Sequence, residues 1–130
     1  REHQGVRYYN DSKATNVDSV WYALQAFTAP IVLLLGGRDK GNDYRRLHEL
    51  VRKRVKAVVA IGESAGTVAA AFNGMAVIKR SSSMDEAVAT ARFLAAPGAV
   101  VLLSPACASF DWFQSYEHRG RVFKELVSAL

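Results

Sequence analysis

The sequence predicts an α/β domain in which an open, mostly parallel sheet carries helices on both faces. Two observations lead to this prediction. Short, continuously apolar runs, typical of strands buried on both faces, alternate with amphipathic stretches of helical length. The strongest runs end at glycine or at Ser-Pro, where a strand would turn toward the next helix. This alternation is typical of a Rossmann-like sheet, and 130 residues suit a single domain over residues 1–130.

Five segments are expected to form the parallel strands. An apolar-aromatic run gives the first at residues 6–9, and a weaker run gives another at 76–78. The three strongest strands are predicted at residues 31–35, 57–61 and 99–103. Gln4-Gly5 is typical of a hairpin turn, so we expect a hairpin whose first strand precedes Arg1 and a chain that is a fragment of a longer protein.

Helices are expected between these strands. They are predicted at residues 17–27, 44–54, 63–72 and 84–94, and a last helix runs through residues 123–127. The start at Met84 is the clearest, because three serines precede it and Asp85-Glu86 follow it. Ser64-Ala65-Gly66 is similar to a phosphate loop but lacks the spacing and the lysine of a Walker A motif, so we interpret it as a helix start.

The composition argues against several classes of function. The net charge of +5 makes nucleic-acid binding the first to weigh, but the basic residues form no single stripe and no nucleic-acid-binding motif accompanies them. No apolar run approaches the roughly 20 residues of a membrane span, and the first residues lack a signal-peptide pattern. The three histidines are far apart, and Cys107 is expected in the core. We therefore expect a cytoplasmic monomer without nucleic acid, membrane or bound metal.

Polar segments follow three of the predicted strands, at residues 11–16, 36–42 and 104–110. Because ligands bind at the carboxyl ends of such strands, we expect one crevice to hold Lys13, Thr15, Lys40 and Ser109. Two cations, two hydroxyls and free backbone N–H groups suit a small dianion such as a dicarboxylate amino acid. Each side chain also has a purely structural interpretation, since the lysines would be solvated and Thr15 or Asn16 would cap a helix.

Three motifs in this order carry a resemblance to a known family. They are Asn-Asp-Ser-Lys-Ala-Thr-Asn at 10–16, Leu-Leu-Leu-Gly-Gly-Arg-Asp-Lys-Gly at 33–41, and Leu-Ser-Pro-Ala-Cys-Ala-Ser-Phe-Asp at 103–111 continuing to Arg119-Gly120. Together they resemble the C-terminal domain of the Mur ligases, most closely the D-glutamate-adding branch, from Gly5 to about Leu126. One loop departs from the family, which often has Asp-Gly-Lys where this chain has Arg38-Asp39-Lys40.

The resemblance implies a three-domain ligase whose N-terminal and central ATPase domains are absent from this chain. Such enzymes use ATP and Mg²⁺ to phosphorylate the carboxylate of UDP-N-acetylmuramoyl-L-alanine. The amine of D-glutamate then attacks the acyl phosphate, and the new amide enters peptidoglycan biosynthesis. The C-terminal domain would bind D-glutamate and close over ATP. The chain alone is expected to be inactive, because it has no P-loop and no carboxylate cluster for Mg²⁺.

By their positions in the matched motifs, seven residues acquire implied roles. D-Glutamate would be bound through its α-carboxylate by Thr15 and Lys40, and through its side-chain carboxylate by Ser109 with backbone groups of Phe110 and Tyr116. The nucleotide and the reacting groups would face Asp11 and Lys13. The resemblance implies no catalytic residue and no metal ligand in this chain.

Three alternatives stay open. The chain would be the same domain of a sister Mur ligase or of a folylpolyglutamate synthase-type ligase, or a free-standing α/β module that binds anions. A diaminopimelate-adding enzyme would show an Asp-Asn-Pro-Arg-type motif, which this sequence lacks. A Walker A motif upstream of Arg1 would exclude the free-standing module. For Ser109 the plain alternative is a helix cap, with Asp111 in the first turn.

Overall fold

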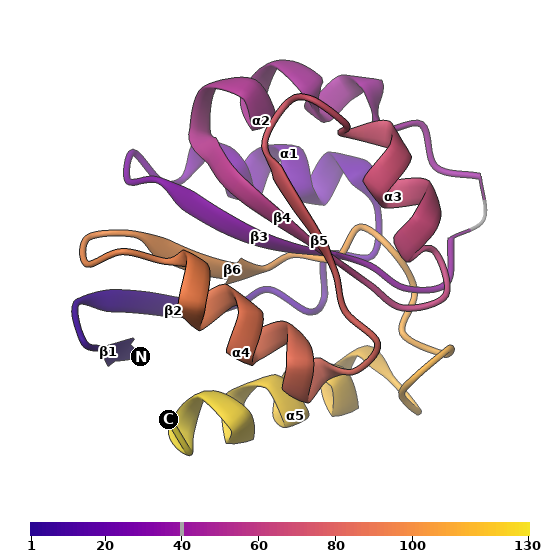
Figure 1. Cartoon of the computed structure of the whole chain (residues 1–130). Helices are drawn as coiled ribbons and strands as arrows, with labels where there is room; N and C mark the ends of the chain where they lie inside the picture. Colours follow the sequence, from indigo (N-terminus) through magenta and orange to yellow (C-terminus); the bar gives the residue numbers. More distant parts are fainter. Residues whose placement is uncertain (40) are drawn as a thin grey trace.

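The computed structural model describes residues 1–39 and 41–130. Within these residues the chain forms one six-stranded sheet with the strand order β1-β2-β6-β3-β4-β5 (Figure 1). The strands are β1 (Glu2–His3), β2 (Val6–Asn10), β3 (Ile31–Gly36), β4 (Val55–Ile61), β5 (Val77–Arg80) and β6 (Val100–Leu103). β1 pairs antiparallel with β2, and the other neighbouring strands pair in parallel. The predicted open, mostly parallel sheet is therefore confirmed.

The helices lie close to their predicted positions. They are α1 (Val17–Gln25), α2 (His48–Arg54), α3 (Ala65–Ala71), α4 (Met84–Leu94) and α5 (Tyr116–Ser128), with a 3₁₀ turn, η1 (Tyr44–Leu47), leading into α2. The side chains of Asn16, Ser83 and Ser115 each accept a hydrogen bond from a backbone N–H in the first turn of α1, α4 and α5. None of the helices in the described part of the chain is long and apolar enough to cross a membrane.

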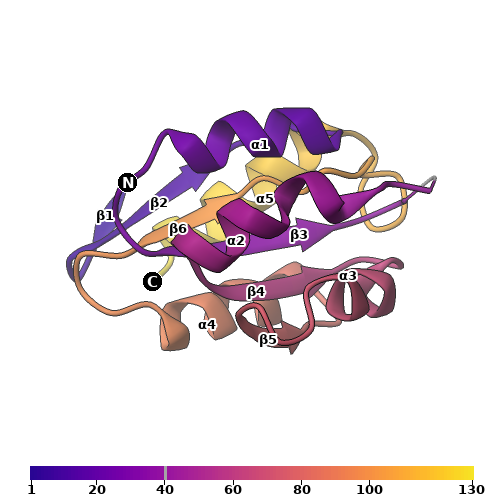
Figure 2. The same ribbon diagram turned by 90° about the horizontal axis from the view of Figure 1, so that it is seen from above.

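The helices cover the sheet from both sides. Figure 2 looks onto the face covered by α1, α2 and α3, while α4 and α5 pack on the opposite face. Side chains of β3 alternate between the two cores: Ile31 and Leu33 pack with α1–α3, and Val32 packs with α4 and α5. All three are fully buried. Because burying each such side chain contributes about 1.5–3 kcal/mol, the continuously apolar run fixes β3 in the centre of the sheet.

The N-terminal hairpin differs from its prediction in one respect. The turn lies at Gln4-Gly5 as expected, and both residues have positive φ (52° and 78°), which is the requirement of a tight type I′ connection. The first strand, however, is Glu2–His3 and lies within the chain, so the expectation that it precedes Arg1 is wrong. A two-residue strand is sufficient because the turn itself fixes the register, pairing His3 with Val6.

Candidate functional site

The three polar loops meet at one edge of the sheet, at the carboxyl ends of β2, β6 and β3. Their backbones are joined directly. The Asp11 N–H donates to the Leu103 carbonyl at 2.7 Å, and the Gly36 N–H donates to the Pro105 carbonyl at 3.0 Å. The Arg38 N–H donates to the Ala108 carbonyl at 2.9 Å. The predicted gathering of the β2–α1 loop, the β3–η1 loop and the β6–α5 segment is therefore present.

Asp11 and Lys13 lie on the β2–α1 loop, as predicted. The Ser104 hydroxyl donates to Oδ2 of Asp11 at 2.9 Å, so one carboxylate oxygen already has a partner. Lys13 is exposed and lines a pocket of about 200 Å³ together with Tyr116. The Ser12 hydroxyl donates to the Tyr116 carbonyl at 2.7 Å, which ties the start of α5 to this loop. The structure thus brings Lys13 and Tyr116 together.

Thr15 is exposed immediately before α1, and its neighbour Asn16 is the residue that caps the helix. Between the start of α1 and the β3–η1 loop lies a pocket of about 440 Å³, with Asn16 and Gly41 on its two sides. Among the described residues that line this pocket, the cation is Arg46, which pairs with Asp18 at 3.0 Å. Lys40, the other predicted ligand of the α-carboxylate, lies outside the described residues.

Ser109 occupies a different place from the one predicted. Helix α5 begins at Tyr116 and is capped by Ser115, so both the helix-cap alternative and the expected position next to the helix start are wrong. Two contacts explain why α5 begins only at Tyr116. The Phe113 N–H donates to the Ser109 carbonyl at 2.9 Å, and the Asp111 carboxylate accepts from the Glu63 N–H at 2.9 Å. These contacts form a separate turn before α5, in which Ser109 is 1% exposed.

Phe110 and Tyr116 flank this turn. The two residues are 61% and 44% exposed. The roles predicted for them use backbone groups, and the Tyr116 carbonyl already accepts the Ser12 hydroxyl. Two exposed rings therefore stand beside the predicted ligand residues at the carboxyl edge of the sheet.

Arg119 is a residue of the site whose importance sequence reasoning missed. It is 1% exposed. Its Nε and Nη2 donate to the hydroxyl and the carbonyl of Ser12 at 2.9 and 2.6 Å, and its Nη1 donates to the Cys107 carbonyl at 2.9 Å. Burial lowers the pKa of the Arg119 guanidinium to about 10. The available signal was its spacing: Arg119 precedes Phe123 by four residues, Phe123 precedes Val127 by four, and all three lie on the buried face of α5.

The β3–η1 loop is also joined to the start of α3. The Gly37 N–H donates to the Ser64 hydroxyl at 3.1 Å, and the Ser64 N–H donates to the Gly37 carbonyl at 3.1 Å. The interpretation of residues 64–66 as a helix start is confirmed, since α3 begins at Ala65. Cys107 is buried as predicted, and burial raises the pKa of its thiol. This thiol is therefore a poor nucleophile.

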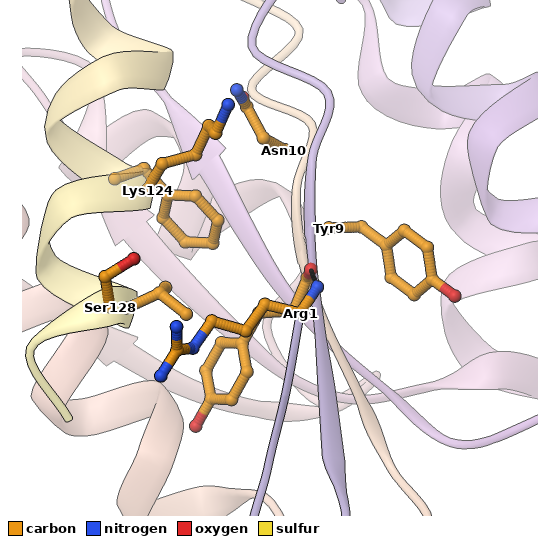
Figure 3. Close-up of a pocket in the computed structure, with 8 residues that line it drawn as sticks. Arg1, Tyr9, Asn10, Lys124 and Ser128 are labelled. Carbon is orange, nitrogen blue, oxygen red and sulfur yellow. Dashed lines mark hydrogen bonds between the residues drawn. The ribbon is translucent and has the colours of Figure 1, made fainter.

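A further pocket of about 360 Å³ lies along β2 and α5 (Figure 3). The side chains of Lys124 and Asn10 point toward one another there, and Arg1 extends toward Ser128, while Tyr9 points away. None of the six predicted site residues that the structure describes lines this pocket. Among the residues that the structure describes, no group of three or more His, Cys, Asp or Glu side chains is placed to hold a metal ion.

Comparison with known proteins supports the resemblance. Residues 1–107 match the family model described as "Mur ligase, glutamate ligase domain". The chain is 56% identical over 126 residues to the UDP-N-acetylmuramoylalanine–D-glutamate ligase of Salinibacter ruber and 54% identical over 125 residues to that of Chloroherpeton thalassium. Each match covers 96% of this chain and 27% of the relative, so the chain spans about a quarter of the length of these relatives. The family match and these identities together show that the chain belongs to the Mur ligase family, in its glutamate ligase domain.

Proposed function

We propose that this chain is the C-terminal, D-glutamate-binding domain of a three-domain cytoplasmic ligase. That ligase joins D-glutamate to UDP-N-acetylmuramoyl-L-alanine through an acyl phosphate, as a step of peptidoglycan biosynthesis. The observation that carries the proposal is the meeting of the three motif-bearing loops at one edge of the sheet. Two relatives at 54–56% identity are named as D-glutamate ligases, which supports the choice of amino acid.

The donors at this edge suit a dicarboxylate. We assign the α-carboxylate to Thr15 and Lys40, since a hydroxyl and a cation together satisfy one carboxylate. We assign the side-chain carboxylate to the Ser109 hydroxyl and to backbone groups of Phe110 and Tyr116. Ser109 is buried, so we expect only its hydroxyl to reach the ligand, through a single hydrogen bond. The contribution of the domain is then orientation of the amine that attacks the acyl phosphate.

ATP and Mg²⁺ belong to the proposed activity of the full-length ligase. Lys13 is an exposed cation that fits contact with a nucleotide phosphate. Asp11 is a single carboxylate with one oxygen bonded to Ser104, and Mg²⁺ requires a fuller set of oxygen ligands. We therefore assign Mg²⁺ and most of the ATP contacts to parts of the ligase outside this chain. Closure of this domain would exclude water from the acyl phosphate.

The proposal is tested with the longer ligase that contains this domain. Release of phosphate from ATP is measured with UDP-N-acetylmuramoyl-L-alanine and a panel of acceptors: D-glutamate, L-glutamate, L-lysine and meso-diaminopimelate. We expect turnover with D-glutamate and little with the others. A preference for diaminopimelate or lysine would favour a sister ligase, and activity on a folate substrate with L-glutamate would favour a folylpolyglutamate synthase-type enzyme.

Lys40→Ala in this ligase is expected to raise the KM for D-glutamate roughly ten- to a hundredfold, because a charge-assisted hydrogen bond of about 1.5–3 kcal/mol is lost. The KM for ATP should change far less. Steady-state kinetics with each substrate varied in turn provide the measurement. The exposed Lys53, which pairs with Glu49 on α2, supplies the control variant Lys53→Ala. An unchanged D-glutamate KM in Lys40→Ala would remove Lys40 from the binding site.

Ser109→Ala and Ser115→Ala separate ligand binding from helix capping. Ser115→Ala removes the hydroxyl that accepts the His118 N–H at 3.0 Å, so it should cost about 1 kcal/mol of stability and leave the D-glutamate KM unchanged. Ser109→Ala should show the opposite pattern, with a KM raised several-fold and a small change in Tm. Both quantities are measured on both variants. A wild-type D-glutamate KM in the Ser109→Ala ligase would show that Ser109 has only a structural role in the turn.

A further inference from the structure

The β3–η1 loop contains a carboxylate that organises the backbone around it. Asp39 Oδ1 accepts the Gly41 N–H at 2.9 Å and the Asn42 N–H at 2.7 Å. One carboxylate oxygen thereby fixes the chain on the C-terminal side of Lys40, as an Asx turn does. In this chain the carboxylate at position 39 is thus placed to receive these two donors.

The second oxygen of this carboxylate binds a tyrosine anchored in the core. Tyr44 donates its hydroxyl to Asp39 Oδ2 at 2.8 Å, and its side chain is 4% exposed. Its ring packs against Phe72 of the α1–α3 core, with the ring centroids 5.6 Å apart. Burial strongly raises the pKa of Tyr44, so the hydroxyl is neutral and remains a donor. The loop is therefore connected to a rigid part of the fold.

The same residues reach across to the segment that carries Ser109. The amide nitrogen of Asn42 donates to the Ala106 carbonyl at 3.0 Å. The Tyr44 hydroxyl lies 3.4 Å from the Cys107 sulfur. Asp39 thus orders the loop internally, and Tyr44 and Asn42 hold it against residues 106–107.

We propose that Asp39 and Tyr44 are positioning residues for the amino-acid substrate. They hold the β3–η1 loop against residues 106–107 and so fix the position of this loop relative to the segment that carries Ser109. We expect this relative position to govern how well the proposed site accepts D-glutamate. This inference rests on the proposed function of the domain. It adds two residues that do not touch the ligand and act through the loops that do.

The experiment uses the longer ligase with the variants Asp39→Ala, Asp39→Asn and Tyr44→Phe. The control variants are Tyr22→Phe, which removes the hydroxyl of a 67% exposed tyrosine, and Asp85→Asn, on the distant helix α4. The KM values for D-glutamate, ATP and UDP-N-acetylmuramoyl-L-alanine are measured for each variant, with kcat and Tm.

We expect Asp39→Ala to raise the D-glutamate KM about tenfold, equivalent to about 1.4 kcal/mol, and Tyr44→Phe to raise it several-fold. The KM values for the other two substrates should stay within about twofold of wild type, which a general loss of stability would not produce. Asp39→Asn should recover part of the loss, because its amide oxygen still accepts the Gly41 and Asn42 N–H groups. Combining Asp39→Ala with Tyr44→Phe should add little to Asp39→Ala alone, since both remove the same contact.

Two results would overturn the inference while leaving the proposed function intact. One is a wild-type D-glutamate KM in Asp39→Ala and Tyr44→Phe. The other is an equal rise of all three KM values with a fall in Tm, which would show that Asp39 and Tyr44 serve only the stability of the fold. A wild-type ligase that does not use D-glutamate would overturn the proposed function and this inference together, and the acceptor panel detects that case before any variant is made.

Discussion

Replacing Arg119 with methionine is expected to lower the free energy of unfolding of the domain by about 3 kcal/mol or more. Methionine removes the guanidinium and keeps much of the apolar stem. The carbonyls of Ser12 and Cys107 then lose their charged donor inside the protein. An unsatisfied buried polar group costs about 1–3 kcal/mol, so the two carbonyls account for this loss, while the Ser12 hydroxyl keeps its bond to the Tyr116 carbonyl. Because a domain has only about 5–15 kcal/mol of stability, this loss is a large part of it.

Burying a cation is itself unfavourable, which opposes this loss. In the described part of the chain no carboxylate lies within ion-pair distance of Arg119, and replacing a buried ion pair by apolar side chains can even stabilise a protein. That stabilisation requires removing both partners. Here the acceptors are backbone carbonyls, which no side-chain substitution removes. The cost of leaving them unsatisfied should therefore exceed the relief from desolvation.

Urea and thermal unfolding measure this effect, with Arg121→Met as the matched control. Arg121 is the exposed arginine two residues further along α5, and its substitution should change stability by less than about 0.5 kcal/mol. Arg119→Met should lower the Tm by on the order of 10 °C for a domain of this size. Equal Tm values for the two variants would show that the three hydrogen bonds of Arg119 contribute nothing net.

Arg119 also shows why one part of the site could be predicted and another could not. The sheet edge followed from the topology, because continuously apolar runs such as residues 31–35 must be central strands and their carboxyl ends must meet. The burial of Arg119 depends on acceptors 107 and 12 residues away in sequence. No local pattern reveals such partners, although the spacing from Phe123 indicated the face on which Arg119 lies.

The prediction for the position of Ser109 was wrong for a different reason. Sequence reasoning placed it at the next helix start, but two serines compete for that role within seven residues, and Ser115 takes it. Asp111 distinguishes the two serines. Its carboxylate accepts the Glu63 N–H in the β4–α3 connection, which holds residues 109–113 in a separate turn. Local propensity ranks Ser109 and Ser115 equally as caps, so only the tertiary contact separates them. By contrast, local contacts fix the start of α4, because the Ser83 hydroxyl accepts the Glu86 N–H and the Glu86 carboxylate accepts the Ser82 N–H.

Gly36→Ala is the second substitution for which we expect a large loss of stability, about 3 kcal/mol or more. Gly36 ends β3 with φ at +134°, a conformation that is open to glycine and strained for alanine. A Cβ on this residue would lie 2.1 Å from the Ile61 carbonyl oxygen of the neighbouring strand. Relief of that overlap requires β3 and β4 to separate where they are hydrogen-bonded, at the point where the β3–η1 loop begins. We therefore expect weaker binding of D-glutamate as well as a lower Tm.

Gly74→Ala distinguishes the steric overlap from the backbone strain. Gly74 has φ at +80°, and a Cβ placed there meets no atom within 4 Å, so alanine at this position should cost only the conformational strain of about 1–2 kcal/mol. The difference in unfolding free energy between the two variants then measures the clash with Ile61. If urea unfolding gave the same value for both, the strand pair would have adjusted to the added methyl group. The tight approach of β3 to β4 would then not be what requires glycine at the entrance to the β3–η1 loop.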